Sequence, residues 1–417
     1  MTVSGPRSGS LAPLRHPNFR WYFVAMTINT AGSTMAGVAL AFAVLSIDDS
    51  PSALGYVLAA STVPLVLFLL FGGVVADRLP LTLLLRVGML VLGGTQGAAA
   101  FLVISGTAQI WMLIVLEAVN GTVMALTFPA FTSIMPQLVP RPLLQQANAL
   151  NSFSRGALRI VGPTISALLV VGAGPGWALA VDAATWLIAG AVLGLVRLPP
   201  RPPREEQTST LRDLREGWVY VRGTTWLWAV VLGFGVLNAI HAGAWFTLGP
   251  AEAKATIGER GWGYVLSAES FGLIATTLVM LRRPLRRPLL SGMLGVAFLG
   301  LPIFVLGWSP AIVPLVACAF VAGAGTEVFS MGWNLAMQEH VPETMLSRAY
   351  SYDALGSFVA MPIGQLLFGP LGEVFGVREV LMASGVAYAL VCLLVLSSRS
   401  VRDLRRVPAE EPVAAPG

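Results

Sequence analysis

The sequence predicts an all-α membrane protein with twelve transmembrane helices in two pseudo-symmetric six-helix bundles. Of its 417 residues, 55% are hydrophobic and only 11% are charged. The mean hydropathy is +0.75, far above that of soluble domains. One long polar break divides the apolar segments into two sets of six.

The apolar segments have the length that a bilayer requires. A spanning helix needs roughly 20 mainly apolar residues. The first segment is too long for the core of a signal peptide and has no cleavage site after it, so we expect an uncleaved first helix. The twelve segments are residues 20–46, 52–76, 81–104, 109–134, 145–172, 175–197, 224–249, 261–281, 287–308, 310–338, 346–371 and 375–397.

The polar break is the segment LPPRPPREEQTSTLRDLREGWVYVRG, residues 198–223. It predicts an N-terminal six-helix bundle at 1–197, a cytoplasmic linker, and a C-terminal six-helix bundle with a short cytoplasmic tail at 224–417. Apolar side chains recur at helical spacing in the second part of the linker. We therefore expect an amphipathic helix on the membrane surface, with Leu211, Leu214, Trp218 and Val221 on its apolar side.

The distribution of the basic residues behind the net charge of +5 indicates membrane topology rather than nucleic-acid binding. With a cytoplasmic start, only Lys254, Arg260 and Arg378 of the 26 basic residues fall outside, and Arg155 and Arg159 fall within a span. The remaining arginines share the cytoplasmic side. The positive-inside rule then places both termini in the cytoplasm of a multi-pass inner (plasma) membrane protein. We expect a monomer in the lipid bilayer, with no nucleic-acid partner.

No residue pattern indicates an enzyme, a metal site or a cofactor. Cys318 and Cys392 lie within predicted helices, without the spacing of a disulfide framework or a metal site. His16, His241 and His340 are scattered, and there is no phosphate-binding loop and no Ser, His, Asp set. We expect no cofactor and no catalytic residues.

The two halves contain a weak internal repeat. The segment LVPRPLLQQANALNSFSRGALRIVGP aligns with HVPETMLSRAYSYDALGSFVAMPIGQ without gaps at an offset of 202 residues. Val139 matches Val341, and Gly162 matches Gly364. Both segments join the fourth and fifth spans of their own half. A duplicated six-helix unit is typical of alternating-access transporters.

The second span ends in GGVVADR, residues 72–78. This helix runs inward, so Asp77 lies at a helix C-terminus, where the backbone dipole disfavours an anion by roughly 0.3–1 kcal/mol. An acid there needs an outside partner, and the N-terminus of the eleventh helix opens on the same side. We expect a cytoplasmic latch between the halves that includes Gly73, Asp77 and Arg78.

These segments resemble a known family. GGVVADR resembles the motif between helices 2 and 3 of the major facilitator superfamily, and GALRIVGPTIS resembles the Gly-Pro motif of its antiporters, with Gly156, Gly162 and Pro163. LVPRPLLQQANALNSFSR and DALGSF resemble the exporter branch that includes enterobactin-type siderophore exporters and macrolide efflux proteins. The resemblance covers essentially the whole chain and implies the major facilitator fold and export of a small molecule.

Charged groups at the centre of a span cost roughly 2.5–3.5 kcal/mol and must face protein or water. Glu117 lies about 14 Å from the outer end of the fourth span, and Arg155 about 16 Å from the inner end of the fifth. These depths coincide in a core about 30 Å thick. We expect Glu117 to pair with Arg155 or Arg159, in either a structural or a coupling role.

Intramembrane acids indicate proton coupling. Protonating a carboxylate of reference pKa about 4.3 at pH 7 costs roughly 3.7 kcal/mol, close to the insertion penalty. A change of surroundings can therefore add or remove the proton. The coupling candidates are Glu117, ranked first, Glu269 and Glu327; the charge partners are Arg155, Arg159, His241 and Asp353.

Few charges remain for the substrate cavity, which favours an amphipathic solute over a highly charged one. The cavity candidates are Asn29, Ser33, Asn120, Met124, Phe128, Asn151, Met331 and Asn334. The sequence thus predicts a secondary active transporter for proton-coupled export of a drug, an antibiotic or a siderophore-like metabolite, a multidrug-type antiporter. An importer or lipid translocator on the same fold, or a transport-inactive sensor, remains open.

Overall fold

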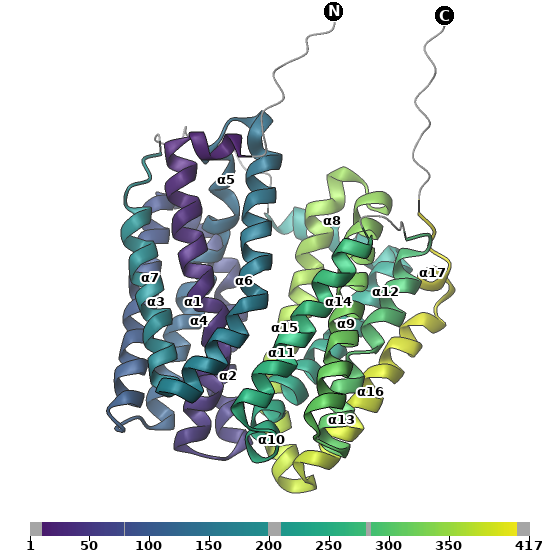
Figure 1. Ribbon diagram of the computed structural model, residues 1–417. Coiled ribbons are helices and arrows are strands. Elements are labelled where there is room, and N and C mark those ends of the chain that lie inside the picture. Colours follow the sequence, from purple (N-terminus) through teal and green to yellow (C-terminus); the bar gives the residue numbers. More distant parts are fainter. Residues whose placement is uncertain (1–10, 79, 199–209, 281–284, 407–417) are drawn as a thin grey trace, which may run out of the picture. The chain divides into compact units, whose positions relative to one another are not determined.

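The computed structural model describes residues 11–78, 80–198, 210–280 and 285–406, and every regular element in these ranges is a helix (Figure 1). Among them, twelve helices are long and apolar enough to cross a membrane. The predicted all-α membrane architecture is confirmed. The spanning helices of the first half are α1 (Pro17–Ile47), α2 (Pro51–Arg78), α3 (Leu81–Ile104), α4 (Ile110–Ser133), α6 (Leu144–Ala173) and α7 (Pro175–Leu193).

The second half contains two interrupted spans. The seventh consists of α9 (Thr225–Ile240), a π-helical segment (His241–Leu248) and α10 (Gly249–Ala255), and the ninth of α12 (Pro288–Ala297) and α13 (Gly300–Trp308). Segments of π-helix are rare and often occur at functional positions. The other spans are α11 (Gly258–Met280), α14 (Ile312–His340), α15 (Glu343–Phe375) and α16 (Val377–Ser397), and the short helices are η1 (Ala12–Arg15), α5 (Met135–Leu138), η2 (Arg141–Leu143) and α17 (Arg399–Arg402).

The described residues pack into two compact units. Unit 1 comprises those within Met1–Arg204, His241–Ser267 and Met361–Val380, and unit 2 those within Glu205–Ile240, Ala268–Ala360 and Leu381–Gly417. The units follow packing and not chain order. The division at 1–197, 198–223 and 224–417 therefore stays a prediction.

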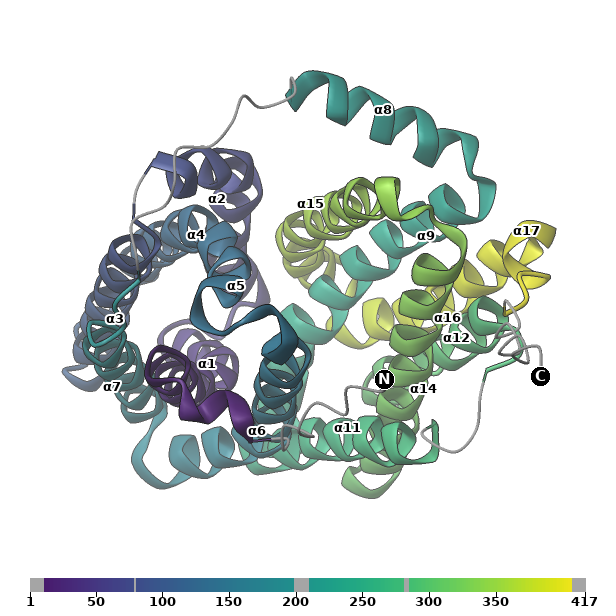
Figure 2. The same cartoon turned by 90° about the horizontal axis from the view of Figure 1, so that it is seen from above.

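In unit 1, the long helices α1, α2, α3, α4, α6 and α7 form a bundle (Figure 2). Helix α6 packs on α1, α1 on α7, α7 on α3, α3 on α4, and α4 on α2. Small residues allow close crossings, as expected where helices pack in a membrane. A Cβ atom on Gly121 would lie 1.9 Å from the carbonyl oxygen of Ser61, and one on Gly162 would lie 2.2 Å from Oγ1 of Thr34.

Polar contacts hold the two later segments of unit 1 to its first helices. Nζ of Lys254 lies 2.6 Å from Oδ1 of Asp49. Oε1 of Glu373 accepts hydrogen bonds from Oγ of Ser50 at 2.5 Å and from the backbone N–H of Ser52 at 3.3 Å. Because Ser52 lies in the first turn of α2, the carboxylate of Glu373 satisfies a backbone donor that the helix leaves unpaired.

In unit 2, the linker forms α8 (Thr210–Gly223) at the position expected for an amphipathic helix. Val221 is buried, and Trp218 lies 5.8 Å from Tyr352 between ring centroids. An ion pair of 2.8 Å joins Glu216 of α8 to Arg348 of α15. The side chains of Leu211 and Leu214 lie outside the described residues, and the location of α8 on the membrane surface stays a prediction.

The crossing of α6 and α1 generates a stability prediction. Gly162→Ala places a methyl group against Thr34, and we expect the free energy of unfolding to fall by about 1–3 kcal/mol from overpacking. Gly156→Ala is the matched control, because no neighbouring atom lies within 4 Å of its Cβ position. That change should be neutral or should stabilise the helix by up to about 1 kcal/mol. Thermal unfolding of both variants in detergent measures the difference, and equal melting temperatures would contradict this packing.

Candidate functional site

The interior of unit 1 contains a group of polar side chains, here called the carboxyl cluster. Its buried members are Gln96 of α3, Glu117 and Asn120 of α4, and Asp182 of α7, and its half-buried member is Thr95 of α3. Glu117 is 6% exposed and Asp182 is 1% exposed. Buried carboxyl groups are rare in membrane helices and tend to mark functional positions. Two of them in one interior make this cluster the leading candidate site.

Neutral donors orient Glu117. Oγ1 of Thr95 donates a hydrogen bond to Oδ1 of Asn120. Nδ2 of Asn120 then donates to Oε1 of Glu117 at 3.2 Å. Gln96 lies beside the same carboxyl group. The result is a directed relay from α3 through α4, which fixes the orientation of the Asn120 amide and the position of the Glu117 carboxyl.

Asp182 is buried without a hydrogen-bond donor of this kind. Neither of its carboxyl oxygens accepts a hydrogen bond from the described residues. The indole of Trp186, one turn along α7, is close to this carboxyl group but does not meet hydrogen-bond geometry. Gly32 of α1 admits the carboxyl group, since a Cβ atom there would lie 2.8 Å from Oδ1 of Asp182. Asp182 is also near enough to Glu117 for the two carboxylates to repel each other.

Within the described part of the chain, no basic nitrogen forms an ion pair with Glu117 or Asp182 within 4.0 Å. The expected pair of Glu117 with Arg155 or Arg159 is therefore not formed. Both arginines lie on an exposed side of α6, whereas Glu117 faces the interior of unit 1. Depth along a helix does not fix the direction of a side chain around the helix axis, so equal depths of Glu117 and Arg155 are not sufficient for a pair.

The other intramembrane acids each have different surroundings. Oε1 of Glu327 accepts a hydrogen bond from Oγ1 of Thr277 at 3.0 Å, and Oδ2 of Asp353 accepts one from Nε1 of Trp333 at 3.0 Å. Glu269 is half-buried on α11, where its backbone contacts Gly323. Glu327 and Asp353 thus have a neutral donor that Asp182 lacks.

His241 begins the π-helical segment. Its ring packs edge-on against Phe246, with centroids 4.8 Å apart, and its Nε2 has no hydrogen-bond partner among the described residues. Its role as a charge partner stays a prediction.

The cavity candidates of the first half divide into two groups. Ser33 is exposed and donates to the carbonyl oxygen of Asn29 at 2.9 Å. Asn120 and Asn151 are instead buried, and Met124 packs against the apolar core of the bundle. Phe128 is 42% exposed. In this half, the polar side of α1 with Asn29 and Ser33 therefore stays a predicted cavity wall. Asn120 of α4 belongs instead to the carboxyl cluster.

In the second half, Asn334 is exposed on α14. Its Nδ2 donates to the carbonyl oxygen of Ser330 at 2.8 Å, and its Oδ1 accepts a hydrogen bond from the hydroxyl of Tyr350 at 3.2 Å. Met331, next to Ser330, is half-buried. These residues keep their place as cavity candidates.

The structure describes the Gly-Pro motif of α6 more fully than the latch motif at the end of α2. Helix α2 extends to Arg78, so Gly73 and Asp77 lie at its end, but the side chains of this latch segment lie outside the described residues. Pro163 lies inside α6, and the adjacent Gly162 sits against Thr34. The latch and the antiporter role of the Gly-Pro motif stay predictions.

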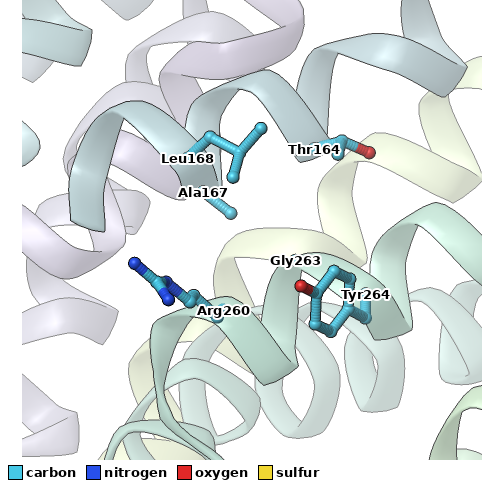
Figure 3. A pocket seen from close by; sticks show the side chains of 6 residues that line it. All are labelled: Thr164, Ala167, Leu168, Arg260, Gly263 and Tyr264. Carbon is cyan, nitrogen blue, oxygen red and sulfur yellow. The ribbon is translucent and has the colours of Figure 1, made fainter. Parts of the chain in front are cut away.

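A shallow pocket lies on unit 1 between α6 and α11 (Figure 3). It holds about one water molecule, so it is too small for a drug-sized solute. Gly263 lets α11 approach α6 closely here, since a Cβ atom on it would come within 2.4 Å of Cβ of Ala167. The lining residues are Thr164, Ala167, Leu168, Arg260, Gly263 and Tyr264.

Asp182 is the residue that the sequence reading missed. It is the single charged residue of the segment PGWALAVDAATWLIAGAVL, which forms α7. An ionisable residue in a span is by default a functional hypothesis, so its isolation in an apolar run was a sufficient signal. Its proximity to Glu117 depends on the packing of α4 and α7, so the spacing of residues along the sequence does not predict it.

Comparisons with known proteins agree with this architecture. The profile of the transmembrane secretion effector family matches residues 8–412. The chain is 27% identical over 413 residues to the enterobactin exporter EntS of Shigella boydii serotype 18 and to that of Escherichia coli K12, covering 95% of each chain in both comparisons.

Solved structures share the fold at low identity. The nucleoside transporter NupG superposes with a TM-score of 0.72 at 12% identity, covering 91% of this chain and 98% of that chain. A bacterial homologue of the human lysosomal transporter Spinster gives 0.69 at 15% identity, covering 94% and 99%. These likenesses confirm the major facilitator fold.

The unsupported carboxyl group of Asp182 generates a second prediction. Asp182→Asn removes a buried charge without removing a hydrogen bond, so we expect the free energy of unfolding at pH 8 to rise by about 1 kcal/mol. Asp353→Asn is the control, because it weakens the bond from Trp333 and should lower stability by about the same amount. Thermal unfolding of the full chain at pH 8 compares them. A loss of stability in Asp182→Asn as large as that of the control would show that Asp182 is an ordinary structural acid.

Proposed function

We propose that this chain, which belongs to the transmembrane secretion effector family of the major facilitator superfamily, exports an amphipathic small molecule in exchange for protons. The similarity to enterobactin exporters over 95% of both chains supports export of a siderophore-like metabolite. The observation that carries the coupling is the carboxyl cluster of unit 1, with two buried acids and no basic partner among the described residues.

The carboxyl cluster has more hydrogen-bond acceptors than donors, which favours the binding of a proton. Three buried acceptor atoms, Oε1 of Gln96 and both carboxyl oxygens of Asp182, lack a donor among the described groups. Two ionised carboxylates in one apolar interior repel each other and are costly to keep dry. One added proton removes a charge and supplies a donor. Glu117 and Asp182 together are therefore suited to hold one proton between them.

Proton binding biases the packing around the cluster. With one proton, the net charge of the pair changes from −2 to −1, and α1, α4 and α7 can close around it. Without the proton, the pair attracts water. Gly32 places the backbone of α1 directly against Asp182, so a change in the cluster acts on this helix. A ligand shifts a conformational equilibrium only through such a difference between states.

The driving force is adequate for concentrative export. One elementary charge that crosses 100 mV releases about 2.3 kcal/mol, which supports a gradient of nearly 50-fold at 1.4 kcal/mol per decade. We propose cytoplasmic termini for this multi-pass membrane protein on the basis of its arginine distribution, which makes the inward proton gradient the relevant one.

Transport in defined vesicles tests the function. The purified full chain is reconstituted in liposomes in inside-out or right-side-out orientation, and enterobactin uptake into the inside-out vesicles is measured with and without an acidic interior. We expect accumulation that depends on the pH gradient and collapses with an uncoupler. Accumulation only in right-side-out vesicles would identify an importer, and enterobactin flux that ignores the pH gradient in both orientations would contradict proton coupling.

The role of Glu117 generates a third prediction. Glu117→Gln keeps an acceptor for Asn120 but cannot release a proton, so acid-driven transport should fall at least tenfold while substrate counterflow at equal pH persists. Glu327→Gln is the control, since Glu327 belongs to unit 2 and has its own donor in Thr277; it should retain most of the acid-driven flux. Initial rates in the same proteoliposomes measure both. Wild-type flux in Glu117→Gln would exclude this residue as the proton carrier.

A further inference from the structure

Unit 2 has a polar patch on α14 and α15, near the turn that connects these helices, here called the aspartate patch. Its members are Asn334 and Gln338 of α14 and Tyr350 and Asp353 of α15. The two amides are exposed, and Tyr350 and Asp353 are half-buried. All four residues belong to unit 2, so the proton binding proposed for the carboxyl cluster does not involve them.

Hydrogen bonds connect the neutral members of the patch across the two helices. The hydroxyl of Tyr350 donates to Oδ1 of Asn334 at 3.2 Å, and Nδ2 of Asn334 donates to the carbonyl oxygen of Ser330 at 2.8 Å. Gln338 lies beside the same hydroxyl, and Tyr350 is near enough to Asp353 for an electrostatic interaction. The patch is therefore a connected set of neutral polar groups beside one carboxyl group.

A buried aromatic stack fixes this carboxyl group. Nε1 of Trp333 donates to Oδ2 of Asp353 at 3.0 Å. Trp333 is 7% exposed, and its ring stacks on Phe329 with centroids 6.2 Å apart and meets Trp226 of α9 edge-on at 5.9 Å. Because rings on two sides hold the indole, it cannot turn away from the acid without disturbing close-packed neighbours. The position of Asp353 is thus preorganised.

One oxygen of the same carboxyl group stays open. Oδ1 of Asp353 accepts no hydrogen bond from the described residues and reaches the surface of the protein. None of the described basic side chains forms an ion pair with it within 4.0 Å. The bases of the two helices have other contacts. Arg348 of α15 forms the ion pair of 2.8 Å with Glu216, and His340 of α14 packs edge-on against Trp226.

The aspartate patch lies within membrane-spanning segments. Asp353 is five residues beyond Arg348, where the spanning part of α15 begins, and Trp333 is seven residues before the end of α14, which correspond to about 7.5 and 10.5 Å. An ionised group at membrane depth must face protein or water. The predicted topology directs this end of both helices toward the cytoplasm, which is the side from which an exporter takes its solute.

We propose that the aspartate patch is a cation-binding subsite that admits amphiphilic amines as transported solutes. The protonated amine donates a charge-assisted hydrogen bond to Oδ1 of Asp353, and its other N–H groups donate to the amide oxygen of Gln338 and the hydroxyl oxygen of Tyr350. One carboxylate supplies too few hard oxygen ligands for a divalent cation. This inference rests on the proposed transport function and extends its solutes from siderophore-like metabolites to amines with a single positive charge.

A matched pair of fluorescent probes tests the subsite. Monodansylcadaverine carries a primary ammonium group at neutral pH, and its N-acetyl derivative has the same fluorophore and chain without the charge. The full chain in nanodiscs of zwitterionic lipid is titrated with each probe, and empty nanodiscs give the background. We expect saturable binding of the charged probe, weakened about tenfold in Asp353→Asn and partly retained in Asp353→Glu, whereas binding of the neutral probe is the same in all three proteins.

The control variant is Asp403→Asn, because Asp403 is an exposed acid of unit 2 outside the aspartate patch. It should leave both affinities unchanged. Equal weakening of both probes in Asp353→Asn would show a packing role for the acid and overturn the proposal. Binding of the charged probe that is not saturable, or that is the same in wild type and Asp353→Asn, would overturn it as well.

Enterobactin transport is scored separately in the vesicle assay, so the subsite and the proposed function can fail independently. Transport that depends on the pH gradient, together with probe binding that ignores Asp353, would reject the cation subsite alone. Charge-selective probe binding without enterobactin transport would instead reject the proposed export of that metabolite and retain the subsite.

Discussion

A buried carboxyl group in a membrane bundle has to be paired, hydrogen-bonded or neutralised, and this constraint determines how unit 1 works. The bilayer offers no water to an ionised group, so each acid inside the bundle must find its partner within the protein. Glu117 finds one in the amide of Asn120. Asp182 finds no donor among the described groups, and the partner proposed for it is a proton.

The same constraint explains why acids and arginines occupy different sides of the bundle. Close crossings at Gly32 and Gly162 bring α7 and α6 against α1, which shields the acids. Movement of α1 can couple a proton in the carboxyl cluster to the transported solute without direct contact between them, and the coupling free energy would depend on how each state packs. This arrangement suits an exchanger better than an ion pair of Glu117 with Arg155 would, because such a pair would neutralise both groups permanently.

Hydropathy predicted the fold because membrane spans are determined by length and apolar composition, which are properties of single segments. The twelve spans and the linker helix α8 followed from it. The candidate site was harder to predict from the sequence. Glu117 was found from its depth in α4, but its expected partner was wrong because depth does not fix the direction around a helix. Asp182 is not among the predicted site residues, although it stands alone in the apolar sequence of α7. The packing that brings it near Glu117 involves α1, α3, α4 and α7, which no spacing in the sequence relates.

The most direct test of the account is whether the carboxyl cluster holds a proton inside the folded protein. Infrared difference spectroscopy of the full chain in bilayers, recorded as the pH is changed, detects the carbonyl stretch of a protonated carboxyl group. The account predicts one such band at neutral pH that loses intensity in alkali and is removed or shifted by both Glu117→Gln and Asp182→Asn, since the two residues share the proton. A spectrum without a carboxylic acid band at neutral pH, or with a band that neither substitution alters, would contradict it.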